Sequence, residues 1–111
     1  MTDSGAPQLL PGTLFMLILR TLERGPLHGY AIAKRIRATS GDDLEIEDGS
    51  LYPALNRLLV KEWVAADWGI SETGRRARFY RLTDIGRKQL EIESREFERL
   101  VKAIRLVMRT A

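Results

Sequence analysis

The sequence predicts a mainly α-helical fold with one small β-hairpin and a long C-terminal helix. Three observations predict it: apolar residues recur at helical spacing in four segments, a polar turn separates two strand-like segments, and no Gly or Pro follows Gly86. With 111 residues, the chain has the length of one ordinary domain.

The first helix is expected to follow a small polar tail, residues 1–8, that we expect to be flexible. Thr13 or Gly12 can cap a helix that runs from Leu14 to about Glu23 or Arg24. The Gly-Pro pair that comes next is typical of a helix end. Because this helix is apolar on most sides, we expect it to be central to the core or shared with a partner chain.

A second helix is expected from about Gly29 to Ala38, with Lys34 pointing outward. Residues 39–43 are small and polar, which is typical of a loop. Residues 44–47 alternate apolar and acidic side chains, and this alternation predicts a very short strand there.

The third helix has the clearest pattern, because its apolar residues form one stripe at helical spacing: Leu51, Ala54, Leu55, Leu58 and Leu59. Pro53 lacks an N–H group, so it should lie in the first turn, with the cap at Gly49 or Ser50. The face opposite the stripe carries Ser50, Pro53, Asn56, Arg57, Val60 and Lys61, with Tyr52 at its edge.

A β-hairpin is expected next, with strands over residues 64–70 and 78–83 and a turn over residues 71–76. Arginines gather at and after this turn: Arg75, Arg76, Arg78 and Arg81. Trp63 and Trp68 are expected to pack in the core or against the hairpin.

Thr83 is expected to cap the last helix, which should run from Asp84 to about Met108. Apolar residues recur on one face of this helix: Leu90, Phe97, Leu100, Val101, Ile104, Val107 and Met108. No later element of the chain could cover that face.

The composition excludes several classes of function. The chain has no Cys and one His, so it offers no disulfide framework, no thiol catalysis and almost nothing for a metal centre. We therefore expect no metal, no cofactor and no enzymatic activity. His28 is expected to be a capping or packing residue. The longest apolar run is too short to span a membrane, and no secretion signal precedes it, which predicts a cytoplasmic protein.

Three helices followed by a hairpin are the order of a winged helix-turn-helix, whose third helix lies in the major groove of DNA. Ser50 and free N–H groups at the start of that helix could bind phosphate, while Asn56, Arg57 and Lys61 offer donors to DNA. The net charge of +3 says little by itself, but the basic residues cluster after the hairpin turn. The interface expected is therefore the third helix and the hairpin.

Four motifs carry a resemblance to a known family: PGTL at 11–14, GPLHGY at 25–30, GSLYPAL at 49–55 and YRLTDIGR at 80–87. In this order and spacing they resemble the PadR family of bacterial transcriptional regulators, from about Leu9 to Met108. The single C-terminal helix is similar to the shorter branch of that family.

The resemblance implies a homodimer, formed through the first helix and the C-terminal segment, that represses transcription from palindromic operators and is released by small, often aromatic, effectors. It assigns DNA contacts to Tyr30, Lys34, Ser50, Tyr52, Asn56, Arg57, Lys61, Arg75, Arg76 and Arg78. It assigns the dimer interface to Leu14, Phe15, Ile18, Leu90, Phe97, Leu100, Val101, Ile104, Val107 and Met108. Some relatives hold flat ligands with a tryptophan in the C-terminal helix, and this chain has none after Trp68.

We therefore expect a winged helix-turn-helix DNA-binding domain over residues 9–83 and a dimerisation helix over residues 84–111. Its expected partners are double-stranded DNA, a second copy of the chain and a possible small aromatic effector, with no membrane. The alternative is a winged helix that binds another protein without reading DNA, since +3 is a modest charge for a nucleic-acid binder.

Overall fold

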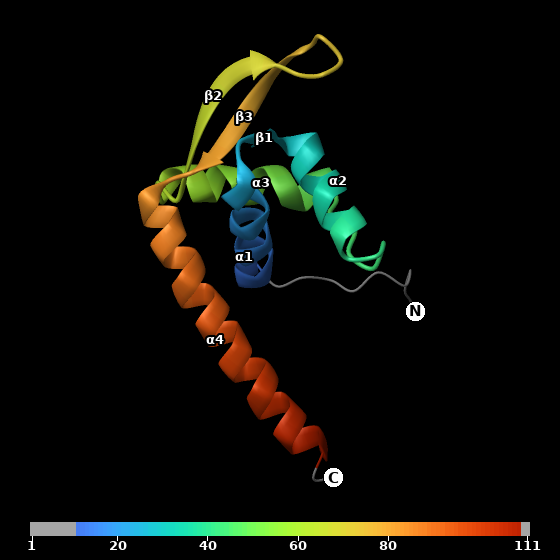
Figure 1. Ribbon diagram of the computed structural model, residues 1–111, viewed down its shortest axis with the longest axis vertical. Helices are drawn as coiled ribbons and strands as arrows, with labels where there is room; N and C mark the ends of the chain where they lie inside the picture. The colour runs from blue at the N-terminus through green and yellow to red at the C-terminus, as the bar shows by residue number, and fades with distance from the viewer. Residues whose placement is uncertain (1–10, 110–111) are drawn as a thin grey trace.

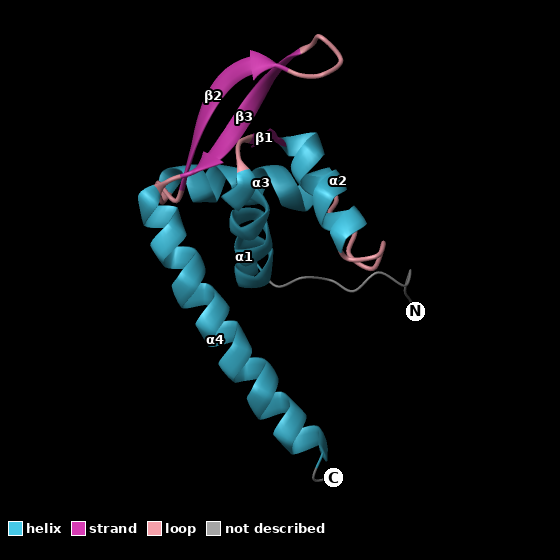
Figure 2. Ribbon diagram, in the orientation of Figure 1, coloured by secondary structure: helices cyan, strands magenta, loops and turns pink. Residues whose placement is uncertain are grey.

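The computed structural model describes residues 11–109, in which helices form the body and a small sheet lies at one end of it (Figures 1 and 2). In chain order the elements are α1 (Pro11–Thr21), the 3-10 turn η1 (Leu22–Arg24), β1 (Leu27–His28), α2 (Gly29–Thr39), α3 (Asp48–Val60), β2 (Val64–Ile70), β3 (Arg76–Leu82) and α4 (Asp84–Arg109). The predicted fold class is confirmed. The tail expected over residues 1–8 lies outside the described residues.

The core lies where α1 meets the helices around it, as Figure 1 shows. Its fully buried side chains come from α1, η1, α2, α3 and β2: Ile18, Leu19, Leu22, Ile32, Leu51, Leu55, Leu58 and Val64. The apolar stripe predicted for α3 is thus the side that packs inward. Burying these side chains stabilises the fold by about 1.5–3 kcal/mol each before entropy is counted.

Helix α1 begins earlier than expected, at Pro11 rather than Leu14. Proline is favoured in the first helical position, because its fixed φ suits a helix and its missing N–H would have no partner there. The helix also ends earlier, and residues expected in its last turn form η1 instead. Gly25 then ends η1 with a φ of 145°, a backbone conformation that residues other than glycine rarely adopt.

The short strand expected over residues 44–47 is wrong, because this segment forms no strand. Leu44 and Ile46 pack against the core without any strand partner. The short strand is β1 instead, which pairs antiparallel with β3 through Leu27 and Tyr80. The resulting sheet has the order β1-β3-β2. A two-residue strand has no alternation to detect, and only its position beside the open edge of β3 makes it a strand.

The first strand of the hairpin, β2, has the bounds expected from the sequence. The second strand, β3, begins at Arg76, two residues before the predicted start. In the ladder Val64 faces Leu82, Ala66 faces Tyr80, and Trp68 faces Arg78. These pairs share one face of the hairpin. Its residues near the helices are buried in the core, whereas those toward the turn are exposed. The hairpin therefore projects from the body, as Figure 2 shows.

Thr83 caps α4 as predicted, since the Gly86 N–H donates to Thr83 Oγ1 at 3.0 Å. The Thr83 hydroxyl donates in turn to the Glu62 carbonyl at 2.7 Å, which fixes the helix to the end of α3. The first part of α4 packs on α1, and Leu90 is buried there within one chain. The C-terminal half extends beyond α1 (Figure 1).

The residues expected at a dimer interface fall into two groups in the single chain. Leu14, Ile18 and Leu90 are already buried in its own core, and Phe15 packs edge-on against Trp63. Leu14, Ile18 and Leu90 therefore have little surface left for a partner, whereas Phe15 is only partly buried. The others lie on the C-terminal half of α4, where Val101 is half-buried and the rest are exposed: Phe97, Leu100, Ile104, Val107 and Met108. Within residues 11–109 no helix is long and apolar enough to span a membrane.

Candidate nucleic-acid interface

The outer face of α3 presents the polar residues that the sequence indicated. Asn56, Arg57 and Lys61 are exposed, on the side opposite the buried Leu55 and Leu58. The position of this face follows from helical spacing, because the leucines bury one side and leave the other to solvent.

The start of α3 differs from the expectation. The helix begins at Asp48 after the N-cap Glu47, so Pro53 is its sixth residue and lies beyond the first turn. The hydrogen bond that proline cannot make would go to Gly49, which is exposed and accessible to water. The Ser50 N–H is not free for phosphate, because it donates to the Glu47 carbonyl at 2.9 Å. Ser50 keeps an exposed side chain and stays a predicted contact.

His28 caps α2, which confirms its structural interpretation. Its Nδ1 accepts a hydrogen bond from the Ala31 N–H at 3.2 Å, so Nε2 carries the proton and donates to Glu72 Oε1 at 3.2 Å. The pKa of the Glu72 carboxyl is lowered, first by a hydrogen bond from its own backbone N–H and then by His28. His28 thereby links the start of α2 to the hairpin turn. Its ring also lies edge-on to Phe79, with centroids 5.4 Å apart.

Two tyrosines lie where α2 meets α3. Tyr30 is 69% exposed, and Lys34 Nζ lies 6.0 Å from its ring centroid. Tyr52 approaches Gly29 so closely that a Cβ at this glycine would lie 2.8 Å from the Tyr52 ring. Burial, followed by the negative charge of Asp48, raises the pKa of the Tyr52 hydroxyl, which therefore stays protonated as a donor.

The hairpin face that carries Val64 and Ala66 in the core presents aromatic and arginine side chains toward the turn. Trp68 is 62% exposed, and the Arg76 guanidinium carbon lies 4.5 Å from its ring centroid. This is a cation–π contact, which holds the guanidinium in place while leaving its N–H groups available. Arg78 lies similarly over Tyr80, 6.0 Å from that ring centroid. Arg75 follows Gly74 in the turn, where a φ of 80° favours glycine.

These elements enclose a groove of about 790 Å³ between the start of α2 and the hairpin. Predicted DNA contacts that line it are Tyr30, Lys34, Tyr52, Arg75, Arg76 and Arg78. The other predicted contacts, Ser50, Asn56, Arg57 and Lys61, do not line this groove. Among the described residues that line the groove, Glu72 is the only acidic one, and its carboxylate accepts a hydrogen bond from His28. The groove is therefore strongly positive.

Trp68 is one of the groove residues that the sequence did not indicate as a DNA contact. Its place in the alternation with Val64 and Ala66 indicated packing, and it does share their face. Because the strand extends beyond the helices at this point, the same face is exposed at Trp68. An aromatic residue opposite an arginine near a hairpin turn was the available signal.

The chain matches the family described as "Transcriptional regulator PadR-like family" over residues 18–92. It is 46% identical over 85 residues to a protein of transposon Tn4556 from Streptomyces fradiae, covering 77% of this chain. The chain spans only 23% of the length of that relative. A protein from Lysinibacillus sphaericus is 28% identical over 100 residues, covering 90% of this chain and 92% of the relative.

Solved structures agree with this match. A transcriptional regulator from Clostridium thermocellum is 32% identical with a TM-score of 0.77, covering 84% of this chain and 90% of that one. A PadR family transcriptional regulator from Eggerthella lenta is also 32% identical, with a TM-score of 0.76, covering 90% of this chain and 85% of that one. Sequence and fold thus lead to the same family, and this chain belongs to the PadR-like family of winged-helix, DNA-binding transcriptional regulators.

Proposed function

We propose that this chain is a sequence-specific repressor that binds a palindromic operator as a homodimer. The observation that carries the proposal is the positive groove between α2 and the hairpin, together with the exposed polar face of α3. In a winged helix these are the surfaces that meet DNA. Residues 9–83 would form the DNA-binding domain and residues 84–111 the dimerisation helix.

The proposed contacts divide by chemistry. Asn56 and Arg57 carry the amide and guanidinium donors that can read base edges in the major groove. Arg75 and Arg76 lie in and beside the hairpin turn, where they can contact phosphates and fix the register of the protein on DNA. Lys34 and Tyr30 would contact phosphates from α2. Trp68, through its contact with Arg76, would keep that arginine extended toward the backbone.

The dimer is proposed to form through the C-terminal half of α4. Phe97, Leu100, Ile104 and Met108 are exposed there on one face of the helix. Packing that face against a second copy removes it from water and places two α3 helices on one face of DNA. Half-sites would then lie about 34 Å apart, one helical turn.

Release by a small-molecule effector is also part of the proposal. Since the sequence has no tryptophan after Trp68, a flat ligand would have no indole from α4 to stack on. An effector held by α4 would therefore rely on weaker partners such as Phe97.

Selection of bound DNA from a random pool tests the proposed function most directly. We expect a recovered palindrome whose half-sites are about one helical turn apart. Recovery of no preferred sequence, with no salt-dependent binding to nonspecific duplex at low salt, would instead support a winged helix that binds protein.

Removing both turn arginines, by Arg75→Ala with Arg76→Ala, should weaken all DNA binding rather than one sequence. Each lost phosphate contact should flatten the slope of log affinity against log salt by about 0.9. Fluorescence anisotropy across a salt series measures this slope. Arg95→Ala with Arg105→Ala is the control, because both residues are exposed on α4, away from the groove. An unchanged slope in the turn variant would contradict the wing assignment.

Replacing a residue that contacts base edges should reduce the sequence specificity of DNA binding. We expect Arg57→Ala to weaken operator binding by about 1–3 kcal/mol and to relax the preference at one base position in each half-site. Nonspecific binding should change much less, because base contacts contribute little to it. Competition with single-base operator variants provides the measurement. A uniform loss across all operator variants would show that Arg57 contacts phosphate instead.

A further inference from the structure

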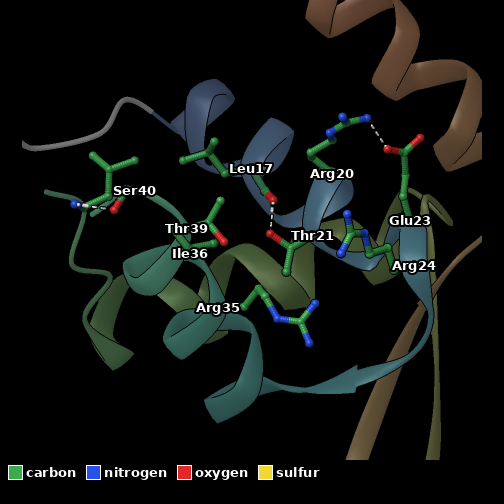
Figure 3. Close-up of a pocket in the computed structure, with 10 residues that line it drawn as sticks. Leu17, Arg20, Thr21, Glu23, Arg24, Arg35, Ile36, Thr39 and Ser40 are labelled. Atoms are coloured by element: carbon green, nitrogen blue, oxygen red, sulfur yellow. Dashed lines mark hydrogen bonds and ion pairs between the residues drawn. The ribbon is translucent and has the colours of Figure 1, made fainter. Parts of the chain in front are cut away.

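A second pocket, of about 400 Å³, lies between the end of α1, η1 and α2, away from the groove (Figure 3). Within residues 11–109 no residue lines both this pocket and the groove. We propose that this pocket binds a small organic anion, a carboxylate carried on a short apolar body. The proposal is independent of DNA binding and of the α4 face.

Among the charged residues that line the pocket, two arginines have no carboxylate as an ion-pair partner in the described part of the chain. Arg20 forms an ion pair with Glu23, which neutralises both. Arg24 and Arg35 form no ion pair with any carboxylate in the described part of the chain. Figure 3 shows their side chains reaching into the pocket from two elements, Arg24 from η1 and Arg35 from α2. An anion between them would relieve the repulsion of two like charges and accept charge-assisted hydrogen bonds.

The position of Arg24 follows from the change of helix type at the end of α1. Thr21 is the last residue of α1 and directly precedes η1, and its hydroxyl donates back to the Leu17 carbonyl at 2.7 Å. Because residues i and i+3 eclipse in a 3-10 turn, Arg24 lies on the same side as Thr21. Both residues line the pocket. In a continuous α-helix the two residues would instead lie about 60° apart around the axis.

The apolar residues of the pocket are the reason for proposing that the ligand has a short apolar body. Leu17, Ile36 and Leu44 line it, and all three belong to or pack against the core. Its volume lies near the lower end of the range for small-molecule sites, about 300–1,000 Å³. A short hydrocarbon chain could cover these residues while its carboxylate remains at the arginines.

Three probes test separately whether the ligand needs its negative charge and its apolar body: hexanoate, acetate and 1-hexanol. Each is added to the full chain at constant ionic strength, and binding is measured by calorimetric titration and thermal unfolding. Hexanoate has both the charge and the apolar body, whereas acetate and hexanol each lack one. We expect saturable binding and an increase in Tm for hexanoate only. Saturable binding of acetate with equal affinity, or no saturable binding of hexanoate, would overturn the proposal.

Arg24→Gln with Arg35→Gln tests the location. Both side chains are exposed, so we expect the variant to fold with an unchanged or raised Tm in the absence of ligand. Hexanoate affinity should fall about tenfold or more, because two charge-assisted hydrogen bonds are lost. Arg95→Gln with Arg105→Gln is the matched control and should bind as the original chain does. Undiminished hexanoate binding in the pocket variant would place the ligand elsewhere, for example on α4, and overturn the proposal.

Discussion

Replacing Ile104 with Glu is expected to convert the proposed dimer into a monomer and to lower operator affinity by about 100-fold or more. Ile104 is 51% exposed on the face of α4 that also carries Leu100 and Met108. A carboxylate there would be buried without a partner when two copies pack together, which costs several kcal/mol. A monomer binds each half-site alone and loses the gain from binding both at once.

Leu106→Glu is the matched control for this experiment. Leu106 lies two residues away and is 50% exposed, but helical geometry places it on nearly the opposite face of α4 from Ile104. Sedimentation equilibrium and operator binding should distinguish the two variants, with Leu106→Glu remaining dimeric. A dimeric Ile104→Glu variant with full operator affinity would contradict the proposed interface.

The second large effect concerns the junction between the winged helix and α4. Gly86→Ala is expected to lower the free energy of unfolding by about 3 kcal/mol. A Cβ at Gly86 would lie 2.0 Å from the Trp63 carbonyl oxygen and 2.9 Å from Leu82 Cδ1. Neither neighbour can move easily, because the Trp63 carbonyl accepts the Thr83 N–H at 3.1 Å and Leu82 is buried. The start of α4 would therefore have to shift away from the body.

Gly49→Ala separates this clash from the general effect of replacing a helical glycine. Gly49 lies in the first turn of α3, and no atom lies within 4 Å of a Cβ at that position. Alanine restricts the unfolded chain more than glycine does, so stability should be unchanged or slightly raised. Urea unfolding monitored by circular dichroism measures both variants. Equal stability of Gly86→Ala and the original chain would show that the junction is more adaptable than its close contacts indicate.

Residues with a strong periodic pattern were placed correctly from the sequence. The α3 stripe of Leu51, Leu55 and Leu58 is buried, and the face that carries Asn56 and Arg57 is exposed. Spacing alone determines this, because side chains three or four residues apart share one side of a helix. The cap at Thr83 was also predicted, and His28, expected to cap or to pack, is a cap, since each depends on a local hydrogen bond to a nearby N–H.

Features that depend on distant segments were not predictable in this way. Leu27 forms a strand only because β3 lies beside it, while residues 44–47 alternate in sequence but find no strand partner. Trp68 is exposed only because the hairpin extends beyond the helices that cover Val64. The same limit applies to Leu90, which lies on the apolar face of α4 yet packs in its own chain.

The sequence by itself therefore determined the helices, the hairpin, the winged-helix order and the family, because periodicity, caps and local motifs act over a few residues. Only the tertiary structure decided which predicted contacts share one groove and which part of the α4 face remains exposed. It also brought Arg24 and Arg35 to one pocket from different elements. The reason is that each of these features joins segments far apart in the chain, whose distance is fixed only when the core packs.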